Sequence, residues 1–326
     1  MKQKILATRT IPQEAIEGIL DRFEVTMPEP EKDIFTKEEV MSMLPGYDVL
    51  FSINEYPVTE DMMTCSSRLK VIANNGAGYN HIDADAATRH GLAVINTPHA
   101  VQMPTAELTI ALMLSITRGI VMYDKELREK RHCRKDMFFE RDMPVEGKTM
   151  GILGMGNIGK KVAQLATALG MKICYHNRHR LSEEIEAQYE ATYLSLEDLL
   201  KTSDVVTVNV PLYKENYHLI NRENIKLMKP TAYLVNAARG PIVEERALLD
   251  ALKNKAIRGA ALDVFEFEPE ISEEMAAIDN IVIVPHVGTN IRKTRINMLK
   301  ESLSGMDAYL SGRHPHNLVN PSVLDK

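Results

Sequence analysis

Three side chains with complementary chemistry follow three apolar segments in the second half of the chain. Arg239 lies in "NAARGPI", Glu268 in "LDVFEFEPE" and His286 in "VPHVGT", each after a run typical of a β-strand. A fixed cation can hold a carboxylate and polarise a carbonyl, while an imidazole beside a carboxylate can deliver a proton. Together they suit the reduction of a 2-keto acid. Taken singly, each fits equally well a strand-end cap, a surface acid or a packed loop histidine.

A glycine-rich turn precedes these residues along the chain. Gly154, Gly156 and Gly159 form G-x-G-x-x-G between the apolar "TMGIL" and a segment of helical period, "NIGKKVAQLATALG". In this context we expect Gly154 to make the turn, Gly156 to let the backbone approach a pyrophosphate, and Gly159 to allow close helix–strand packing. The pyrophosphate would lie on the N–H groups that begin the helix. A purely structural glycine turn is the alternative.

The segment that should contact the cofactor ribose contains no carboxylate. About 20 residues beyond the glycine turn, where an Asp or Glu usually holds the ribose hydroxyls of NAD, the chain reads "HNRH", residues 176–179. Arg178 and His179, helped by Asn177, could hold a 2′-phosphate, which predicts a preference for NADP(H). A solvated basic loop beside a pocket that also accepts NAD(H) stays open.

These residues must be positioned by alternating strands and helices, which predict an α/β fold with parallel sheets covered on both faces. We expect two doubly wound, Rossmann-like domains: residues 1–98 with 289–326, and residues 99–288. One long helix is expected near residues 103–130, and it begins apolar nearly all round, which favours burial between domains or subunits.

Bulk properties exclude several classes of function. The net charge of −6, from 39 basic and 45 acidic residues, argues against nucleic acid or an anionic membrane as a partner. No apolar run approaches the roughly 18 residues of a membrane span, and no secretory leader is evident. Three cysteines without a C-x-x-C spacing indicate a reducing compartment, so we expect a cytoplasmic protein. His176 with His179, and His314 with His316, lack ligand-like neighbours, so no metal is expected.

Seven stretches together resemble the D-isomer-specific 2-hydroxyacid dehydrogenases over nearly the whole chain. They are "NNGAGYNHID", "PTAELTIALML", "GILGMGNIGKKVA", "NVPLYKENYHLIN", "LVNAARGPIVEERALLDAL", "GAALDVFEFEP" and "PHVGT". Within that family the chain is most similar to the glyoxylate, hydroxypyruvate and 2-ketogluconate reductases. The resemblance implies an active-site cleft between two domains, the return of the C-terminal segment to the first domain, and a homodimer formed through the long helix.

The resemblance also implies roles for individual residues. Arg239, Glu268 and His286 match the catalytic residues, with His286 as the acid/base and Glu268 keeping it charged. Asn54, Ala77 and Gly78 match the substrate-binding loops, together with Arg239 and His286. Motif and resemblance together give these cofactor contacts: Ala77, Thr105, Gly154, Met155, Gly156, Asn157, Ile158, Gly159, Asn177, Arg178, His179, Val210, Pro211, Ala237, Ala238, Arg239, Asp263, His286 and Gly288.

The expected reaction is hydride transfer from NADPH, or NADH, to a small 2-keto acid, giving a D-2-hydroxy acid. A D-lactate- or phosphoglycerate-type NAD-dependent dehydrogenase is an alternative, and so is a dinucleotide-sensing, corepressor-like binding protein. Formate dehydrogenases carry a Gln where Glu268 stands, which disfavours that activity. The choice of keto acid depends on loops around Asn54, Tyr56 and Tyr79, whose geometry the sequence does not give.

Overall fold

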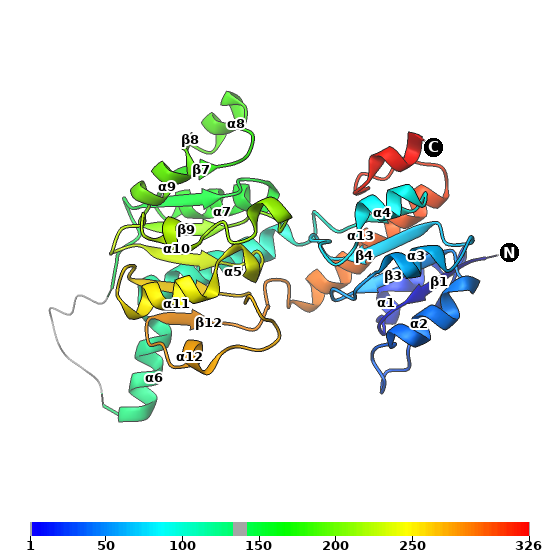
Figure 1. The fold of residues 1–326 in the computed structure, drawn as a ribbon, viewed down its shortest axis with the longest axis horizontal. Coiled ribbons are helices and arrows are strands. Elements are labelled where there is room, and N and C mark those ends of the chain that lie inside the picture. Colours follow the sequence, from blue (N-terminus) through cyan, green and yellow to red (C-terminus); the bar gives the residue numbers. More distant parts are fainter. Residues whose placement is uncertain (1, 133–141, 326) are drawn as a thin grey trace. The chain divides into compact units, whose positions relative to one another are not determined.

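The computed structural model describes residues 2–132 and 142–325 (Figure 1). The chain divides into two compact units, one of Met1–Val101 with Thr289–Lys326 and the other of Gln102–Gly288. Each unit contains one sheet, and every strand pairing within the two sheets is parallel. The expected α/β class with two parallel sheets is confirmed. Cys133 lies outside the described residues.

The first unit is built on a five-stranded sheet in the order β2-β1-β3-β4-β5. The order reverses between β1 and β3, which is where open α/β sheets place ligands, beyond the carboxyl ends of the strands. The strands are β1 (Gln3–Ala7), β2 (Phe23–Thr26), β3 (Val49–Ile53), β4 (Val71–Asn75) and β5 (Ala93–Ile95). The helices are α1 (Gln13–Ile16), α2 (Lys37–Met43), α3 (Glu60–Thr64), α4 (Ala84–Arg89) and α13 (Arg292–Leu310), with 3₁₀ turns η1 (Glu17–Ile19), η2 (Leu44–Gly46) and η5 (Pro321–Asp325).

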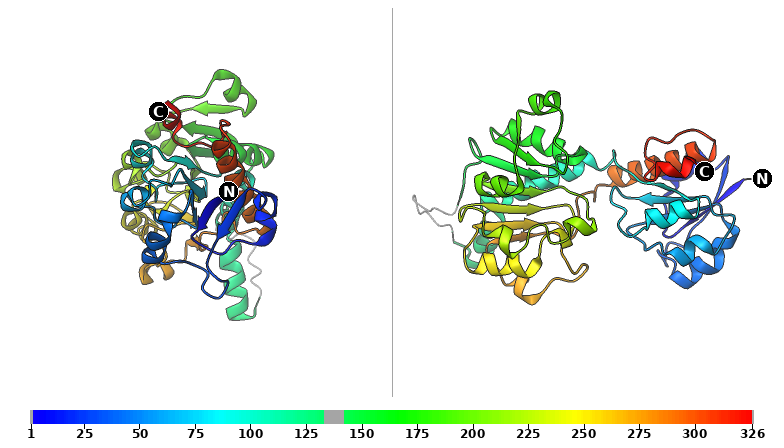
Figure 2. Two further views of the ribbon diagram at one scale, coloured as in Figure 1. Left: turned by 90° about the vertical axis from the view of Figure 1, so that its right-hand side faces the viewer. Right: turned by 45° about the horizontal axis from the view of Figure 1, so that its top comes forward.

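Helix α13 comes from the far end of the chain and completes the first unit. Its Leu299, Leu303 and Met306 are buried against β-strand residues such as Ile5 and Phe51. Residues after the helix then run beside β5, where Ile95 and Leu318 form an antiparallel bridge. Figure 2 shows α13 and the C-terminal segment side by side against this sheet. The first unit is therefore closed by its own C-terminal segment.

The second unit is built on a seven-stranded sheet in the order β12-β11-β10-β9-β6-β7-β8. Strand β6 pairs with both β7 and β9, so the order reverses there. The strands are β6 (Thr149–Leu153), β7 (Lys172–His176), β8 (Ala191–Tyr193), β9 (Val205–Val208), β10 (Tyr233–Asn236), β11 (Gly259–Leu262) and β12 (Ile281–Ile283). The helices are α5 (Gln102–Thr117), α6 (Ile120–Lys130), α7 (Asn157–Ala168), α8 (Glu183–Gln188), α9 (Leu196–Thr202), α10 (Arg222–Ile225), α11 (Glu245–Lys253) and α12 (Glu273–Ala276), with 3₁₀ turns η3 (Lys214–Asn216) and η4 (Gly240–Ile242).

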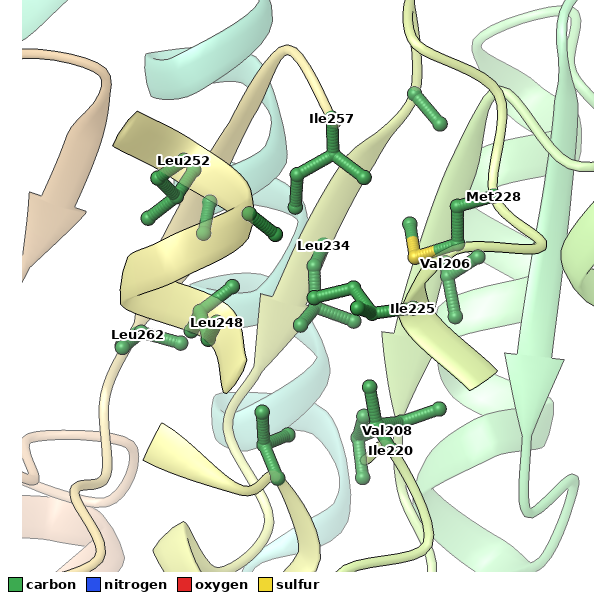
Figure 3. Packing of buried hydrophobic residues seen from close by; sticks show 14 of the residues in the cluster. Val206, Val208, Ile220, Ile225, Met228, Leu234, Leu248, Leu252, Ile257 and Leu262 are labelled. Carbon is green, nitrogen blue, oxygen red and sulfur yellow. The ribbon is translucent and has the colours of Figure 1, made fainter. Parts of the chain in front are cut away.

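Both faces of the seven-stranded sheet are buried. In β10, Leu234 packs on the face covered by α9 to α12, whereas Val235 packs on the face covered by α5 and α7. Figure 3 shows the first of these layers, with Leu248 and Leu252 of α11 packed over the sheet. Burial on both faces explains why the strands are continuous apolar runs and not alternating ones. The polar residues that follow these strands must then lie at the rim of the sheet.

The prediction of a single long helix near residues 103–130 is wrong. The chain forms α5 and α6, which are bent by 56° at the break between them. Gly119 adopts a left-handed backbone, φ 59°, which ends the first helix and redirects the chain. No single helix in the described ranges is long and apolar enough to cross a membrane, although this bent pair passes that test by length and composition alone.

Candidate functional site

The glycine turn has the geometry that its spacing predicts. Gly154 follows β6 with φ 93°, and a Cβ there would lie 2.7 Å from the backbone nitrogen of Val210. A Cβ on Gly159 would lie 2.3 Å from the carbonyl oxygen of Gly154, so only glycine lets α7 pack this close. By contrast, a Cβ on Gly156 would have nothing within 4 Å. Packing within the protein therefore does not require a glycine at position 156. The open space beside Gly156 lies at the N-cap of α7.

The start of α7 is suited to an anion. Gly156 is its N-cap and no side chain caps the helix. The first N–H groups of a helix have no partner within the helix, and they lie at the positive end of its dipole. Asn157 and Ile158, two further predicted contacts of this turn, begin the helix and place their backbone N–H groups where a pyrophosphate would bind. The N–H of Met155, the remaining predicted contact, is instead hydrogen-bonded to Asn177.

The ribose segment follows β7 and is fixed at one end to the glycine turn. The side-chain oxygen of Asn177 accepts a hydrogen bond from the Met155 N–H at 2.7 Å. Arg178 and His179 are exposed, and within residues 2–132 and 142–325 neither side chain has a hydrogen-bond or ionic partner. Asn177 thus supports the loop through its oxygen, while the two basic side chains remain available to a phosphate.

A carboxylate does lie near this loop, but a neighbouring arginine neutralises it. Arg180 donates two hydrogen bonds to Glu186, at 2.9 and 2.8 Å, and the Tyr175 hydroxyl donates a third at 2.7 Å. These bonds lower the pKa of Glu186 to about 2. Burial, followed by the bond to Glu186, raises the pKa of Tyr175 to about 12. The pair holds the chain that follows Arg178 and His179, and Glu186 is therefore not available to pair with either of those side chains.

Glu268 and His286 form a hydrogen-bonded pair. Nδ1 of His286 lies 3.1 Å from Oε2 of Glu268, and Oε1 of Glu268 accepts the Phe265 N–H at 2.8 Å. The pKa of Glu268 is lowered below its usual value. Burial is the largest single effect and acts to raise this pKa, but it is outweighed by the hydrogen bonds from His286 and Phe265 together with the positive charges of His286 and Arg239. An ionised Glu268 therefore faces the Nδ1 nitrogen of the His286 ring.

A buried aspartate fixes the loop that carries His286. Asp263, at the end of β11, accepts hydrogen bonds from the N–H groups of Val287 at 2.6 Å and Gly288 at 3.0 Å. Its own carbonyl accepts the His286 N–H at 2.8 Å. His286 itself has a left-handed backbone, φ 51°, an uncommon conformation for a residue with a Cβ. Asp263 was predicted as a cofactor contact, and in the structure its two oxygens hold the turn after His286.

Arg239 follows β10, and the segment that carries it is locked to the segment that carries Glu268. A Cβ on Gly240 would lie 1.8 Å from the Phe265 carbonyl oxygen, so the two backbones touch. Beyond that contact, Glu266 accepts the Glu245 N–H at 2.9 Å, and Glu245 accepts the Glu266 N–H at 3.3 Å. The segments that carry Arg239 and Glu268 are thus fixed to each other by one close backbone contact and by two hydrogen bonds between backbone N–H groups and glutamate side chains.

Glu266 is also held by His218 and Tyr217. Nε2 of His218 lies 2.6 Å from Oε1 of Glu266, and the Tyr217 hydroxyl donates to the same oxygen at 3.2 Å. Burial raises the pKa of Glu266, but the hydrogen bonds from the Glu245 N–H and His218 prevail and lower it. Burial raises the pKa of Glu245. This network could not be predicted from the sequence, because its members lie in three separate segments and show no local pattern.

The other predicted cofactor contacts of this unit lie at the same rim of the sheet. Val210 and Pro211 follow β9, while Ala237 and Ala238 follow β10. Thr105 lies on α5, and its hydroxyl is 3.7 Å from the position that a Cβ on Gly288 would take. Because the strands are parallel, these residues gather at their carboxyl ends with the glycine turn, Arg239 and His286.

In the first unit, the predicted substrate loop is held through its carbonyl groups. The Gly76 carbonyl accepts from the Asn74 side chain at 3.0 Å, and the Ala77 carbonyl accepts from the Asn96 side chain at 2.9 Å. In a trans peptide the N–H points opposite to the carbonyl. The N–H groups of Ala77 and Gly78 therefore face away from these asparagines, as a two-donor anion site requires.

Asn54 directly follows β3 in the same unit. It is exposed and has a left-handed backbone, φ 61°. It follows the strand next to the reversal of strand order, the position that favours ligand contacts. The asparagines that hold the loop, Asn74 and Asn96, were not predicted. Their only sequence signal is an Asn within one residue of the end of a buried strand, and Asn236 of β10 has the same position.

Comparison with known proteins identifies the family. A family model described as the NAD binding domain of D-isomer specific 2-hydroxyacid dehydrogenases matches residues 110–288. The glyoxylate reductase of Thermococcus onnurineus is 38% identical over 331 aligned positions, which cover 100% of this chain and 98% of that protein. The fold and the glycine turn already indicate a Rossmann-type dinucleotide-binding protein. The chain belongs to the D-isomer-specific 2-hydroxyacid dehydrogenases, oxidoreductases that act on CH–OH donors.

Solved structures of similar enzymes have the same fold over nearly the whole chain. The crystal structure of a glyoxylate reductase from Paecilomyes thermophila is 30% identical with a TM-score of 0.89, covering 98% of this chain and 99% of that one. An NADPH-dependent glyoxylate/hydroxypyruvate reductase from Sinorhizobium meliloti, solved with NADP and malonate, is 27% identical with a TM-score of 0.85, covering 99% and 98%.

Proposed function

We propose that this enzyme reduces a small 2-keto acid, of the glyoxylate, hydroxypyruvate or 2-ketogluconate type, to the D-2-hydroxy acid. NADP(H) is the preferred cofactor and NAD(H) is also accepted. The observation that carries the proposal is the hydrogen-bonded Glu268–His286 pair at the same sheet rim as Arg239 and the glycine turn. The names of the glyoxylate reductases similar to this chain support the substrate class.

The residues present fit a nicotinamide dinucleotide phosphate. The open space at Gly156 and the uncapped start of α7 suit a pyrophosphate. Arg178 and His179 suit a 2′-phosphate, because the nearby carboxylate of Glu186 is held by Arg180 and does not compete for them. When bound, the nicotinamide supplies the hydride. The similar reductase solved with NADP supports the same preference.

The chain's own residues bind the keto acid and move the proton. Arg239 holds the carboxylate and polarises the carbonyl, and the N–H groups of Ala77 and Gly78 hold the carboxylate as well. Nε2 of protonated His286 gives its proton to the carbonyl oxygen as that oxygen gains charge. Ionised Glu268, hydrogen-bonded to Nδ1, stabilises the imidazolium before transfer and holds the ring in place.

The proposed enzyme acts as a homodimer formed through the region of α5 and α6. No residue of α6 is buried within the chain, and Ile120, Val121 and Leu127 expose about half of their surface each, at 54%, 46% and 48%. Exposed apolar side chains on a helix whose second half is mostly charged suit a protein–protein contact.

The test is the initial rate of NADPH and NADH oxidation with glyoxylate, hydroxypyruvate, 2-ketogluconate, pyruvate and phenylpyruvate. A simple ketone without a carboxylate is the control, because Arg239 and the Ala77–Gly78 loop have nothing to bind on it. We expect turnover of a small keto acid, faster with NADPH, with a D product and none from the ketone. Faster turnover with NADH, best on pyruvate, would favour a lactate-type dehydrogenase. No turnover with either cofactor would favour a dinucleotide-sensing protein.

A further inference from the structure

Two histidines and a glutamate that have no role in the proposed reaction meet in the first unit. His99 lies in the turn after β5, Glu301 on α13, and His316 in the segment after α13. One ligand atom from each lies within 4.8 Å of the other two. The histidine pairs considered from the sequence were neighbours along the chain. This cluster instead brings His316 to residues far away in the sequence.

The carboxylate of Glu301 is fixed in place before any ion binds. Its side chain is only 10% exposed. The N–H of His99 donates to Oε1 at 3.1 Å and the N–H of Ala100 donates to Oε2 at 2.9 Å. These two bonds orient the carboxylate so that Oε1 also faces both imidazole rings. A ligand held this way loses little freedom on binding an ion.

A buried asparagine fixes the segment that carries His316. Asn317, 3% exposed, donates from its side chain to the carbonyl oxygens of Asn96 at 2.7 Å and Glu301 at 3.3 Å. Its own carbonyl accepts the Asn96 N–H at 3.2 Å. Asn317 therefore connects the stretch that precedes His99, the helix that carries Glu301 and the residue next to His316. The three ligand-bearing segments are joined by the fold itself.

The distances suit a small transition-metal ion. Oε1 of Glu301 lies 2.8 Å from Nδ1 of His99 and 3.8 Å from Nε2 of His316. Ligand atoms on a tetrahedral zinc ion, with bonds of about 2.0–2.1 Å, lie about 3.3 Å apart. The two observed separations bracket that value, and the two ring nitrogens lie within 4.8 Å of each other, so rotation of the exposed rings can bring all three atoms to one ion. The ring centroids are 5.1 Å apart and tilted by 51°, so the rings are not stacked on each other.

The donor set also selects the kind of ion. Two imidazoles and one carboxylate suit Zn²⁺ and similar divalent transition metals, whereas Ca²⁺ and Mg²⁺ prefer oxygen ligands alone. Three protein ligands leave a fourth position for water. With neutral histidines the cluster carries one negative charge, which favours a cation.

We propose that His99, Glu301 and His316 bind one divalent transition-metal ion of the zinc type. The ion ties the turn before α5, helix α13 and the C-terminal segment together, and so stabilises the first unit. A purely structural explanation covers Glu301, which holds the 98–101 turn through two backbone N–H groups, and the His99 ring, whose Nδ1 lies within hydrogen-bond distance of the same carboxylate. That explanation gives no role to the His316 ring, so His316 distinguishes the two.

The test uses full-length, tag-free protein dialysed against a chelator and then titrated with ZnCl₂. Bound zinc is measured by equilibrium dialysis and metal analysis, and the thermal midpoint is measured with and without zinc. His316→Ala and His99→Gln each remove one ligand and leave both N–H groups that hold Glu301. His314→Ala is the matched control, because that histidine is exposed, lies two residues away and is not in the cluster.

We expect one zinc per chain, with an increased thermal midpoint, for the unmodified protein and for His314→Ala. His316→Ala and His99→Gln should bind at least tenfold more weakly, since losing even an outer-shell partner weakens metal sites by about 10–100-fold. The proposal is overturned if no saturable zinc binds, if both ligand variants bind as the unmodified protein does, or if His314→Ala loses zinc equally. Binding that survives in both ligand variants would place the zinc at other histidines.

Discussion

Replacing Glu268 with Gln tests how the carboxylate acts on His286. Gln has nearly the same shape and can still hydrogen-bond to Nδ1, so the ring should stay in place while the negative charge is lost. Reduction requires a protonated imidazole, so kcat/KM falls as pH rises and that proton is lost. Without the charge of Glu268, the imidazole keeps its proton only to a lower pH. The midpoint of the pH profile should therefore move down.

The size of that movement follows from the geometry. Unit charges 3.1 Å apart, the separation of Nδ1 and Oε2, interact by about 1.3 kcal/mol in bulk water. In surroundings with half the dielectric constant of bulk water, the interaction energy doubles to about 2.7 kcal/mol. The side chains are 39% and 31% exposed, so water screens the pair substantially and values from the deep interior do not apply. The expected displacement is about one to two pH units.

The assay is kcat/KM for keto-acid reduction by NADPH measured from pH 5 to 10. Glu270→Gln is the matched control, because this exposed acid lies two residues from Glu268 and should leave the midpoint unchanged. A Glu268→Gln profile with the midpoint of the unmodified enzyme would refute the electrostatic role. A lower rate at every pH without displacement would mean that Glu268 only positions the ring.

Three further perturbations test other parts of the account. Arg178→Ala should raise KM for NADPH at least tenfold and leave KM for NADH within twofold, because a charge-assisted bond contributes about 1.5–3 kcal/mol; equal effects on both would remove the phosphate role. Gly240→Ala should destabilise the fold by about 1–3 kcal/mol in a denaturant titration, since the neighbouring backbone cannot yield, whereas Gly46→Ala, with open space around it, should not. Glu186→Gln should lower the thermal midpoint at pH 7. The folded-state pKa of Glu186 is lowered to about 2, so the difference should shrink as pH falls from about 4.5 to 2, and a constant difference would contradict the pairing with Arg180.

Much of the fold follows from short-range patterns in the sequence. The apolar runs predict parallel strands buried on both faces, and the structure has them in both units. Glycine spacing predicts the turn after β6, and Gly154 and Gly159 each meet backbone atoms that exclude a side chain. The carboxyl ends of parallel strands lie at one edge of a sheet. The polar residues that follow the strands of the second unit could therefore be predicted from the sequence to lie near one another.

The remainder depends on contacts between distant segments. The pairing of Glu245 with Glu266, the hold of Asn96 on the Ala77 carbonyl, and the meeting of His99 with Glu301 have no local signature. The break between α5 and α6 had a local signal in Gly119. A glycine inside a helical pattern is often tolerated, so that signal alone did not decide the outcome.

The role of His286 as proton donor is tested most directly by His286→Ala. The measurement is kcat/KM for the best keto acid, with the dissociation constant for NADPH determined in parallel. We expect kcat/KM to fall by about 10²–10⁴-fold, the usual contribution of a general acid, with NADPH binding within twofold of the unmodified enzyme. Normal turnover by this variant would contradict the account, because no proton from His286 would then be needed at the substrate carbonyl.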